Sequence, residues 1–582
     1  MTSNMMGSKD RPKIMTAKFP CPQSLERVPL DLILPVVLFF LAVVAFVPGL
    51  SGVPPLDRDE PRFAQASKQM LEAHQYIDIR FQDQSRYKKP IGIYWLQTAA
   101  VTLTGHDAKA PLWVYRLPSF IGGILAVLLT YWVARAFSDP KTAFIAALLV
   151  GSTIILGVEA RLAKTDASLL WTVILAQGAL ARLWLEKKTT PSWGLAFCFW
   201  TSLAVGVLIK GPISLMVIGL TLAGLFAFER DIKWFKSAVP FFGFLWFLAL
   251  VLPWFLVIGK LTNYAFFQEA LGHDLLGKVL EGQESHGKPP GMHLVFMAIV
   301  FWPLPGFLIL SIPRIWQKRS EKITRFCASW FLPSWIVFEL MGTKLPHYTM
   351  PLLPALAICV AAAMSRGDDH HAHTFFKWTG AVFLGLPALL LTIATIFLPL
   401  HLGISPSLPG IATSVVAALL VLFAAMRLVA GRAVQAVPVA IGGAFIMSAG
   451  FWGYVAPALK PIWISSRLVT AISEVAPCRN PAVAIAGFGE PSFVFLEGTN
   501  TRITSGQQAA DFLVSNQPAP PADAMADSAT AACRVVAIES RQEKAFLTEA
   551  QTKSITPTPI KLVQGLNING GHHMTIGLYA SP

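Results

Sequence analysis

The stretch TAFIAALLVGSTIILGVEARLAKTDASLLWTVILAQGALARLWL (142–185) contains two long apolar runs separated by a short charged segment. Each run approaches the length that an α-helix needs to cross a bilayer, about 17 to 25 residues. Between them, RLAKTDASLL (161–170) places Arg161, Lys164 and Asp166 close to a region where charge is costly. The stretch therefore predicts two membrane helices joined by a turn whose ionisable groups have a function.

The rest of the chain repeats this pattern. Of its 582 residues, 54% are hydrophobic and only 14% are charged, and the apolar runs recur at membrane-spanning length. The first run follows a basic N-terminus and lacks a small-x-small cleavage site, so we expect a retained span rather than a cleaved signal peptide. The sequence predicts an all-α polytopic membrane protein with about thirteen transmembrane helices. The expected spans are 30–50, 113–136, 141–157, 167–184, 193–209, 212–228, 237–258, 293–312, 325–341, 349–364, 377–399, 409–427 and 435–455.

The net charge of +14 does not indicate a nucleic-acid-binding protein. Lys and Arg concentrate in short connectors between spans, such as 229–236 and 313–325, whereas a nucleic-acid partner would require a basic face on a folded domain. If residues 1–29 are cytoplasmic, every basic connector falls on the cytoplasmic side. The alternation then sends the tail, 456–582, to the outside, which in a bacterium is the periplasm of the inner membrane.

The same alternation brings five unusual segments to the outer face: 51–112, 158–166, 209–212, 259–292 and 342–348. In the first, Asp59 and Glu60 precede Pro61 at a helix start, and apolar residues then recur at helical spacing. This predicts an amphipathic helix on the membrane surface, followed by a second interfacial helix after Lys89. Taken alone, Asp59 and Glu60 fit a helix cap in water as well as they fit a functional site. The convergence of five segments on one membrane face favours the functional site.

The residue types on this face point to the chemistry. Lysine and arginine at a bilayer surface suit a phosphate headgroup whose tail lies in lipid, and a neighbouring carboxylate suits proton transfer or cation binding. Together they predict group transfer from a lipid phosphate. No phosphate-binding glycine-rich loop precedes an expected helix, so ATP is not expected as an energy source. The candidate substrate-binding residues are Arg62, Arg86, Lys88, Lys89, Lys210, Lys344, His347 and Tyr348.

Six motifs carry a family resemblance. DRDEPRF (57–63), KKPIGIYWLQ (88–97), RLAKTDA (161–167), LIKGP (208–212), ESHGKPPG (284–291) and TKLPHYTMPLLPAL (343–356) occur in order. They resemble the bacterial lipid-linked glycosyltransferases of the aminoarabinose transferase type, which belong with the protein O-mannosyltransferases in the GT-C fold. The resemblance implies a GT-C transmembrane catalytic domain over 30–455, with main periplasmic loops at 51–112 and 259–292. It also implies inverting transfer of a sugar from a polyprenyl-phosphate donor to a periplasmic acceptor such as lipid A, lipopolysaccharide core or protein.

The resemblance assigns roles to individual residues. Asp59, beside Glu60, matches the family's essential acidic position, and Asp166 matches the second. On this basis the expected catalytic residues are Asp59, Glu60 and Asp166. Arg62, Lys89 and Lys210 match positions expected to hold the lipid phosphate, and Tyr348 matches an aromatic residue near the donor.

The sequence departs from the family in two places. Phe63 stands where many members have tyrosine, and Lys88 stands where some members have a glutamate that is a candidate metal ligand. A divalent metal held by His273, Glu284 and His286 is possible, but hydrogen bonds from these side chains to the loop backbone account for them equally well. The sugar and the acceptor stay open, and Lys88 favours a more acidic donor or acceptor.

The tail predicts a small α/β domain. AVAIAGFG (482–489), SFVFLEG (492–498), RVVAIES (534–540) and MTIGLYA (574–580) have the composition of short strands, and 505–516 and 541–551 that of helices. Cys478 and Cys533 fall in this region and form either a disulfide or two buried thiols. The tail is expected to cap the cavity or to help dock the acceptor.

Three other protein classes compete with this prediction. A transporter would place polar residues deep within spans and often repeats one half of its fold, whereas the charges here gather at one membrane face. A GT-C ligase that moves whole lipid-linked glycans would lack the pairing of DEPRF with KKP. A catalytically silent relative is the third, and Lys88 is a feature that favours it.

Overall fold

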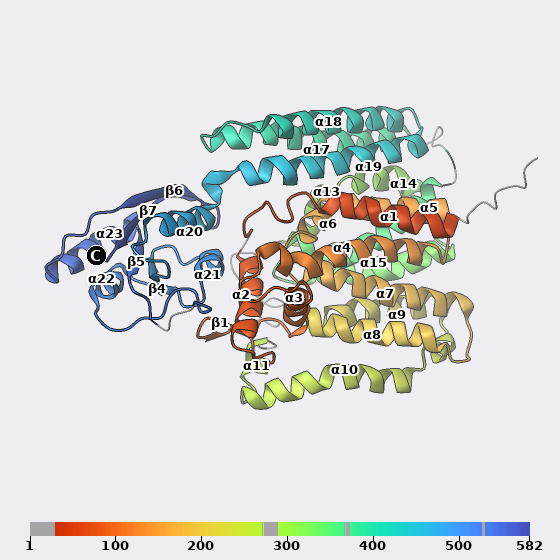
Figure 1. Cartoon of the computed structure of the whole chain (residues 1–582). Helices are drawn as coiled ribbons and strands as arrows, with labels where there is room; N and C mark the ends of the chain where they lie inside the picture. Colours follow the sequence, from red (N-terminus) through yellow and green to blue (C-terminus); the bar gives the residue numbers. More distant parts are fainter. Residues whose placement is uncertain are drawn as a thin grey trace, which may run out of the picture.

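In the computed structural model, the described residues are 30–56, 58–270, 272, 277, 289–365, 367, 373–526 and 530–581. Most of them lie in a bundle of long helices, and a smaller unit with a β-sheet lies at one end of the bundle (Figure 1). The bundle helices are α1 (Leu30–Phe46), α4 (Leu112–Ala134), α5 (Pro140–Gly151), α6 (Ile154–Glu159), α7 (Asp166–Glu186), α8 (Trp193–Lys210), α9 (Ile213–Glu229), α10 (Pro240–Leu261), α13 (Met292–Val300), α14 (Leu304–Gln317), α15 (Lys322–Leu340), α16 (Leu353–Met364), α17 (Thr374–His401), α18 (Leu408–Val429) and α19 (Ala433–Gly450).

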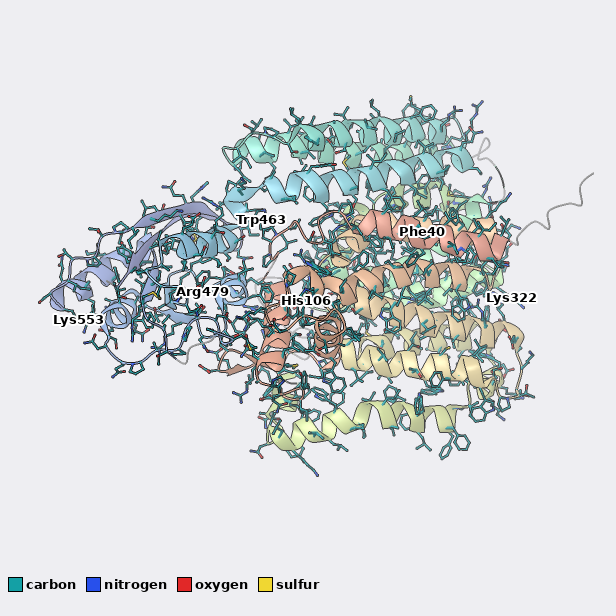
Figure 2. All side chains as sticks on the ribbon, in the orientation of Figure 1. Phe40, His106, Lys322, Trp463, Arg479 and Lys553 are labelled. Carbon is teal, nitrogen blue, oxygen red and sulfur yellow. A yellow bond between two sulfur atoms is a disulfide. The ribbon has the colours of Figure 1, made fainter. Side chains whose placement is uncertain are left out.

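Every expected span coincides with a helix or a broken helix of this bundle. Among the described residues, eight helices are long and apolar enough to cross a membrane, or nine if the bent pair α13–α14 forms one span. The chain is therefore a multi-pass membrane protein, while the total of about thirteen crossings stays a prediction. Large apolar side chains such as Phe40 on α1 face outward from the bundle, and Lys322 lies at the end far from the sheet (Figure 2).

Two expected spans are broken rather than straight. The predicted span 293–312 consists of α13 and α14, which are bent by 114° at a short break. Pro303 and Pro305 lie at this break and at the start of α14, where proline removes a backbone donor and favours a helix start. The predicted span 141–157 consists of two helices: α5 ends at Gly151, and α6 begins at Ile154. Helix α6 ends at Glu159 and α7 begins at Asp166, so the charged turn 160–165 lies between them at the end of the bundle.

Helix α4 fixes the position of that turn. Gly122 of α4 faces α7 so closely that a Cβ atom there would lie 2.7 Å from the carbonyl oxygen of Ala167. The hydroxyl of Ser119, one turn earlier, donates to the carbonyl of Lys164 at 3.0 Å. A small residue at such a contact lets two membrane helices approach closely. The start of α7, and with it Asp166, is therefore held from α4.

We expect Gly122→Ala to destabilise the protein by about 1–3 kcal/mol, because the added methyl group meets backbone atoms that cannot rotate away. Gly219→Ala is the matched control, since Gly219 also lies within a bundle helix but a Cβ there meets nothing within 4 Å. The check is the thermal unfolding midpoint of both variants in the same detergent. Equal midpoints for the two variants would contradict this account of the α4–α7 contact.

Segments outside the bundle cover the end that lies next to the unit with the β-sheet (Figure 1). They include α2 (Asp59–Glu72), the short hairpin β1 (Arg80–Phe81) and β2 (Gln84–Ser85), α3 (Gly92–Leu103) and α11 (Ala265–Phe267). Both helices expected in the first outer loop are present, since α2 begins at Asp59 and α3 follows Lys89 and Pro90. Helix α2 lies between the bundle and the C-terminal unit (Figure 1).

The C-terminal unit is a five-stranded sheet with helices packed on it. Its strands have the order β4-β3-β5-β7-β6, in which β3 runs parallel to β4 and β5, and β7 runs antiparallel to β5 and β6. Trp463 lies between the bundle and this unit (Figure 2). The elements are α20 (Ile464–Val475), β3 (Ala482–Ala486), α21 (Pro491–Glu497), β4 (Arg502–Thr504), α22 (Gly506–Val514), β5 (Arg534–Glu539), α23 (Ser540–Thr552), β6 (Lys561–Asn567) and β7 (His572–Ala580).

One strand that the sequence predicts in this unit is not present. The segment SFVFLEG (492–498) is helix α21, because Pro491 occupies the first turn and is well suited to begin a helix. The strands β3, β5 and β7 and the helices α22 and α23 fall where the sequence predicts them, whereas β4 and β6 were not expected. Cys478 and Cys533 form a disulfide in the structure, which answers the question that the sequence left open.

Candidate active site

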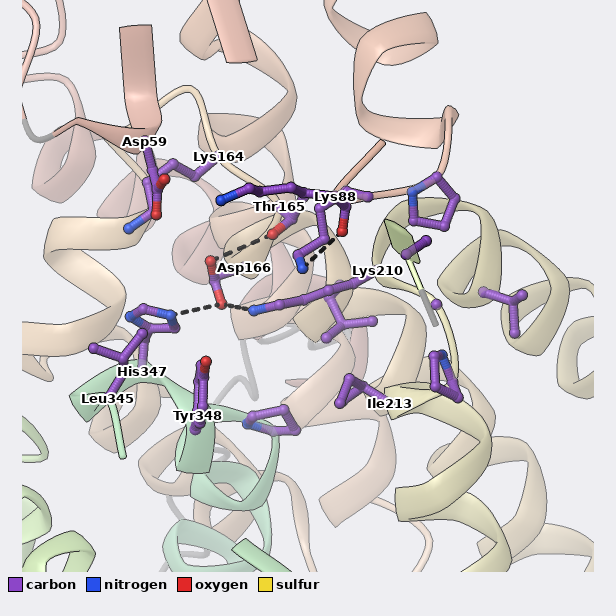
Figure 3. Close-up of a pocket in the computed structure, with 18 of the residues that line it drawn as sticks. Asp59, Lys88, Lys164, Thr165, Asp166, Lys210, Ile213, Leu345, His347 and Tyr348 are labelled. Carbon is purple, nitrogen blue, oxygen red and sulfur yellow. Dashed lines mark hydrogen bonds and ion pairs between the residues drawn. The ribbon is translucent and has the colours of Figure 1, made fainter. Parts of the chain in front are cut away.

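The charged turn before α7 forms part of a cavity of about 410 Å³ at the end of the bundle that carries α2. Its wall combines cationic and acidic side chains from α2, the loop after β2, the turn 160–165, α7, α8 and the segment before α16 (Figure 3). The ionisable and aromatic residues among the expected site residues that line it are Asp59, Arg86, Lys88, Lys89, Asp166, Lys210, His347 and Tyr348.

Asp166 is the centre of the deepest charged group. Its carboxylate forms an ion pair with the ammonium of Lys210, and its Oδ1 lies 3.8 Å from Nε2 of His347 (Figure 3). The side chain of Asp166 is only 4% exposed, so the ammonium of Lys210 and the imidazole of His347 replace the water that a carboxylate otherwise needs. The ammonium of Lys210 also lies 5.8 Å from the ring centre of Tyr348. A lysine, a histidine and a tyrosine from distant parts of the chain are thus grouped around one acid.

Lys164 and Glu159 extend this group. The sequence singled out Lys164 as part of the charged turn but gave it no role, and it did not select Glu159. The Nζ of Lys164 lies 3.5 Å from Oε1 of Glu159, and Nδ1 of His347 lies 3.9 Å from the same oxygen. Lys164 lines the cavity beside Asp166. The signal in the sequence was the presence of a glutamate and a lysine between two apolar runs, where each needs a partner.

Asp59 faces the cavity from the opposite wall. It begins α2, and Arg62, one turn later, places its guanidinium 3.9 Å from the Asp59 carboxylate. Burial disfavours the charged form of Asp59, but the positive charges of Lys164, Arg86 and Arg62 outweigh it and lower the pKa of the carboxyl group. Asp59 is therefore ionised near neutral pH, and about half of its side chain is exposed.

The cavity also has an extensive apolar wall. Leu169, Ile213, Leu215, Phe255, Phe266 and Phe267 contribute to it. Phe63, which stands in place of the family's tyrosine, packs 5.6 Å from the ring of Tyr94 and 4.9 Å below the guanidinium of Arg86. The cavity therefore offers cations and hydrocarbon side by side, which matches the two chemical halves of a lipid phosphate.

Glu60 does not line the cavity with Asp59, and the structure places it in a buried ion pair instead. Its oxygens accept from Nε and a terminal nitrogen of Arg116 at 2.7 and 3.0 Å, and from the backbone of Leu56 and Ala163 at 2.7 and 2.9 Å. Arg116 in turn donates to the carbonyls of Leu50 and Val53. Glu60 is fully buried and joins the first outer loop to α4 and the charged turn.

We expect Glu60→Gln to cost about 3–5 kcal/mol of stability, because Arg116 would keep its buried charge without a counter-ion. The measurement is the unfolding midpoint in detergent. The double variant Glu60→Gln/Arg116→Met removes both charges and should recover part of that loss. A single variant as stable as the native protein would contradict an anchoring role.

Two other charged residues are structural. Arg161 donates to the carbonyls of Ala45, Pro48 and Gly157, and its guanidinium lies 5.4 Å from the ring of Trp452, so it joins α1 and α6 to the end of α19. Lys344 is buried and donates to the carbonyl of Met341 at 2.6 Å. It does not line the cavity, so the structure does not place it beside the other expected substrate-binding residues.

The proposed metal ligands His273, Glu284 and His286 lie outside the described residues. Within the described part of the chain, no group of three or more His, Cys, Asp or Glu side chains is placed to hold a metal ion. Lys88, where some relatives carry a candidate acidic ligand, lines the cavity together with Arg86 and Lys89. These described donors are cationic and do not suit a divalent ion.

Comparisons with known proteins agree with the fold and with the motifs. A model of the dolichyl-phosphate-mannose-protein mannosyltransferase family matches residues 88–256. An undecaprenyl phosphate-alpha-4-amino-4-deoxy-L-arabinose arabinosyl transferase of Pseudomonas paraeruginosa is 27% identical over 376 residues, which cover 62% of this chain and 65% of that protein. The chain thus matches slightly less than two thirds of the length of that relative.

Solved structures show the same architecture. The crystal structure of ArnT from Cupriavidus metallidurans bound to undecaprenyl phosphate superposes with a TM-score of 0.71 at 16% identity, covering 94% of this chain and 97% of that one. An oligosaccharyltransferase from Archaeoglobus fulgidus gives a TM-score of 0.50 at 12% identity, covering 85% and 68% of the two chains. The fold is that of a polytopic membrane protein with the architecture of these structures. In sequence the chain is similar to lipid-linked glycosyltransferases of the aminoarabinose transferase and protein O-mannosyltransferase type, which confirms the resemblance carried by its motifs.

Proposed function

We propose that this protein is an integral membrane glycosyltransferase that moves a sugar from a polyprenyl phosphate to an acceptor on the periplasmic side of the bacterial inner membrane. The observation that carries the proposal is that one cavity is lined by both cationic and apolar side chains. Arg86, Lys88, Lys89, Lys164 and Lys210 face the same space as a cluster of phenylalanine and aliphatic side chains. A phosphate joined to a long hydrocarbon chain is the ligand that uses both.

The reaction proposed for this site is an inverting displacement. The acceptor oxygen attacks the anomeric carbon of the sugar from the face opposite the phosphate, and the bond from that carbon to the phosphate oxygen breaks. The electron pair of the broken bond leaves with the polyprenyl phosphate, whose growing charge Lys89 and Lys210 stabilise, with Arg62 supporting them from beside the cavity. The proton of an acceptor hydroxyl passes to Asp59. If the acceptor is itself a phosphate, it brings no proton, and Asp59 orients it instead.

Asp166 has a supporting part in this proposal. Its ion pair with Lys210 and its proximity to His347 hold the lysine at the cavity wall. Tyr348 limits the movement of the same lysine through its ring. Similarity to an undecaprenyl phosphate-alpha-4-amino-4-deoxy-L-arabinose arabinosyl transferase supports an undecaprenyl-phosphate donor for this chain too.

The proposal also includes the topology. Residues 30–455 would form the catalytic transmembrane domain with about thirteen crossings, and residues 456–582 a periplasmic α/β domain. Support comes from the position of the cavity, which lies at the end of the bundle that carries α2 and the C-terminal unit (Figure 1). The basic connectors lie toward the opposite end, which the positive-inside bias assigns to the cytoplasm.

The test is a transfer assay with the full chain reconstituted in lipid. A panel of radiolabelled polyprenyl-phosphate sugars, including an aminopentose, a uronic acid and mannose, is offered with lipid A, lipopolysaccharide core and a periplasmic protein extract as acceptors. Transfer from one donor supports the proposal and identifies the sugar. Binding of several donors without any transfer would overturn it in favour of a silent relative. Movement of a donor lipid across the bilayer without transfer would favour a transporter.

A further inference from the structure

The cavity-lining helix α2 is held on its other side by the C-terminal unit. Helix α21 packs against α2, and the loop after α21 follows the same face (Figure 1). Phe495 of α21 enters the apolar cluster that contains Ala64 of α2 and Tyr115 of α4, with 5.5 Å between the rings of Phe495 and Tyr115. We call this contact the α2–α21 interface, meaning α2 with residues 490–501.

Polar contacts in the interface converge on Thr499. Its hydroxyl accepts from Nε2 of Gln65 at 2.7 Å and donates to Oε2 of Glu72 at 2.7 Å. Gln65 and Glu72 are seven residues apart, so one hydroxyl connects two successive turns on one face of α2. Because one partner is a carboxylate, the bond to Glu72 is of the stronger, charge-assisted kind.

The same loop also holds the segment that leads to the cationic wall. Nε2 of Gln82 donates to the carbonyls of Thr499 and Thr501 at 3.0 and 2.6 Å. Gln82 and Gln69 of α2 exchange two further bonds, at 2.7 and 3.1 Å. Residues 499–501 therefore fix α2 and the turn before Arg86 relative to each other.

Additional contacts reach both ends of α2. Near its start, a terminal nitrogen of Arg58 lies 3.3 Å from Oε1 of Glu490. Farther along, Nζ of Lys68 donates to the carbonyl of Phe495 at 3.2 Å. The ion pair between Asp59 and Arg62 is long, at 3.9 Å, so the position of the Asp59 carboxylate depends on the orientation of the helix that carries it.

We infer that Thr499 is a positioning residue for the transfer reaction, and that the C-terminal unit acts in catalysis by holding α2, and thereby Asp59, against the cavity. The inference rests on the proposed function, because it assigns Thr499 a part in the same reaction. It gives the C-terminal unit a role distinct from capping the cavity or docking an acceptor. Thr499 itself does not line the cavity and is not expected to touch substrate.

The test compares Thr499→Val, which keeps the shape and loses the hydroxyl, with Thr499→Ser, which keeps the hydroxyl. We expect Thr499→Val to lower kcat of transfer about tenfold, the effect of losing one charge-assisted bond. The Kd for a polyprenyl phosphate should not change, because Lys89, Lys164 and Lys210 lie on other elements. Thr499→Ser should restore kcat. Thr470→Val is the matched control, since Thr470 is exposed on α20 and bonds only within its own helix among the contacts described.

A second readout does not require activity. Amide hydrogen exchange of residues 59–72 should be faster in Thr499→Val than in the native protein and in Thr499→Ser, while exchange in α7 and β3 stays unchanged. Native kcat in Thr499→Val would overturn the inference, whatever the exchange shows. If the native protein transfers no sugar, the proposed function fails, and unchanged exchange in α2 would then show separately that Thr499 does not hold the helix.

Discussion

Asp59→Asn is expected to lower the rate of sugar transfer by about 10²- to 10⁴-fold, the range associated with loss of a general base. The asparagine keeps the size of the side chain at the start of α2 but cannot accept a proton. Lysine and arginine side chains around the cavity outweigh the effect of burial and lower the pKa of Asp59, so the native side chain is a carboxylate. Binding of polyprenyl phosphate should persist, since lysines of other elements hold the phosphate.

The measurement is the initial rate of transfer by the reconstituted protein, with lipid binding determined separately. Asp83→Asn is the control, because Asp83 lies exposed in the β1–β2 turn of the same outer loop. A folded-state pKa below the ordinary value of Asp keeps Asp59 ionised from about pH 8 down to pH 5, so this group should produce no acid limb in that interval. A full rate in Asp59→Asn would remove the assignment. A small loss in Asp59→Asn with a large loss in Asp59→Ala would indicate that Asp59 orients the acceptor.

The membrane helices were predictable because their signal is local. A run of about twenty apolar residues needs no partner to be recognised, and each expected span holds a helix or a broken helix. The breaks were harder to predict. The bend between α13 and α14 depends on the prolines around residue 303 and on packing against α17, where the indole of Trp302 donates to the carbonyl of Leu384. The prolines are visible in the sequence, but their packing partner is not.

The different surroundings of the two neighbouring acids of α2 could not be predicted from the sequence. Asp59 and Glu60 are adjacent, and successive residues of a helix point about 100° apart. The cavity receives Asp59, while Glu60 turns toward Arg116, which is 56 positions along the chain. Without the position of Arg116, the two carboxylates are equivalent. The motif therefore predicts the same role for both acids, whereas the structure places only Asp59 at the cavity.

The tail illustrates the same limit in a short segment. SFVFLEG has the composition of a strand, and only Pro491 before it suggests a helix start. The outcome depended on Phe495, which is buried against α2 and α4 rather than in the sheet. Tertiary packing of one aromatic side chain overrode local propensity there.

Lys210→Met is expected to reduce the transfer rate by about 10²- to 10³-fold, the cost of removing one group that stabilises charge in the transition state. Methionine keeps most of the apolar length of lysine beside Tyr348 and removes the ammonium. The affinity for polyprenyl phosphate should also fall, because Lys210 lines the cavity and carries one of the charges that would meet the phosphate. Lys210→Arg keeps the charge and should retain most of the binding.

The single variant has a second effect that must be separated from the first. Asp166 is 4% exposed and forms an ion pair with Lys210, so loss of the ammonium leaves a buried carboxylate with weaker compensation and lowers stability. Lys210→Met/Asp166→Asn removes both charges, and we expect it to recover the unfolding midpoint but not the transfer rate. Lys460→Met, at an exposed lysine outside the cavity, is the control for the loss of a positive charge. If the double variant transferred sugar at the native rate, Lys210 and Asp166 would be a structural ion pair. Lys89 and the other cations of the cavity would then stabilise the leaving phosphate.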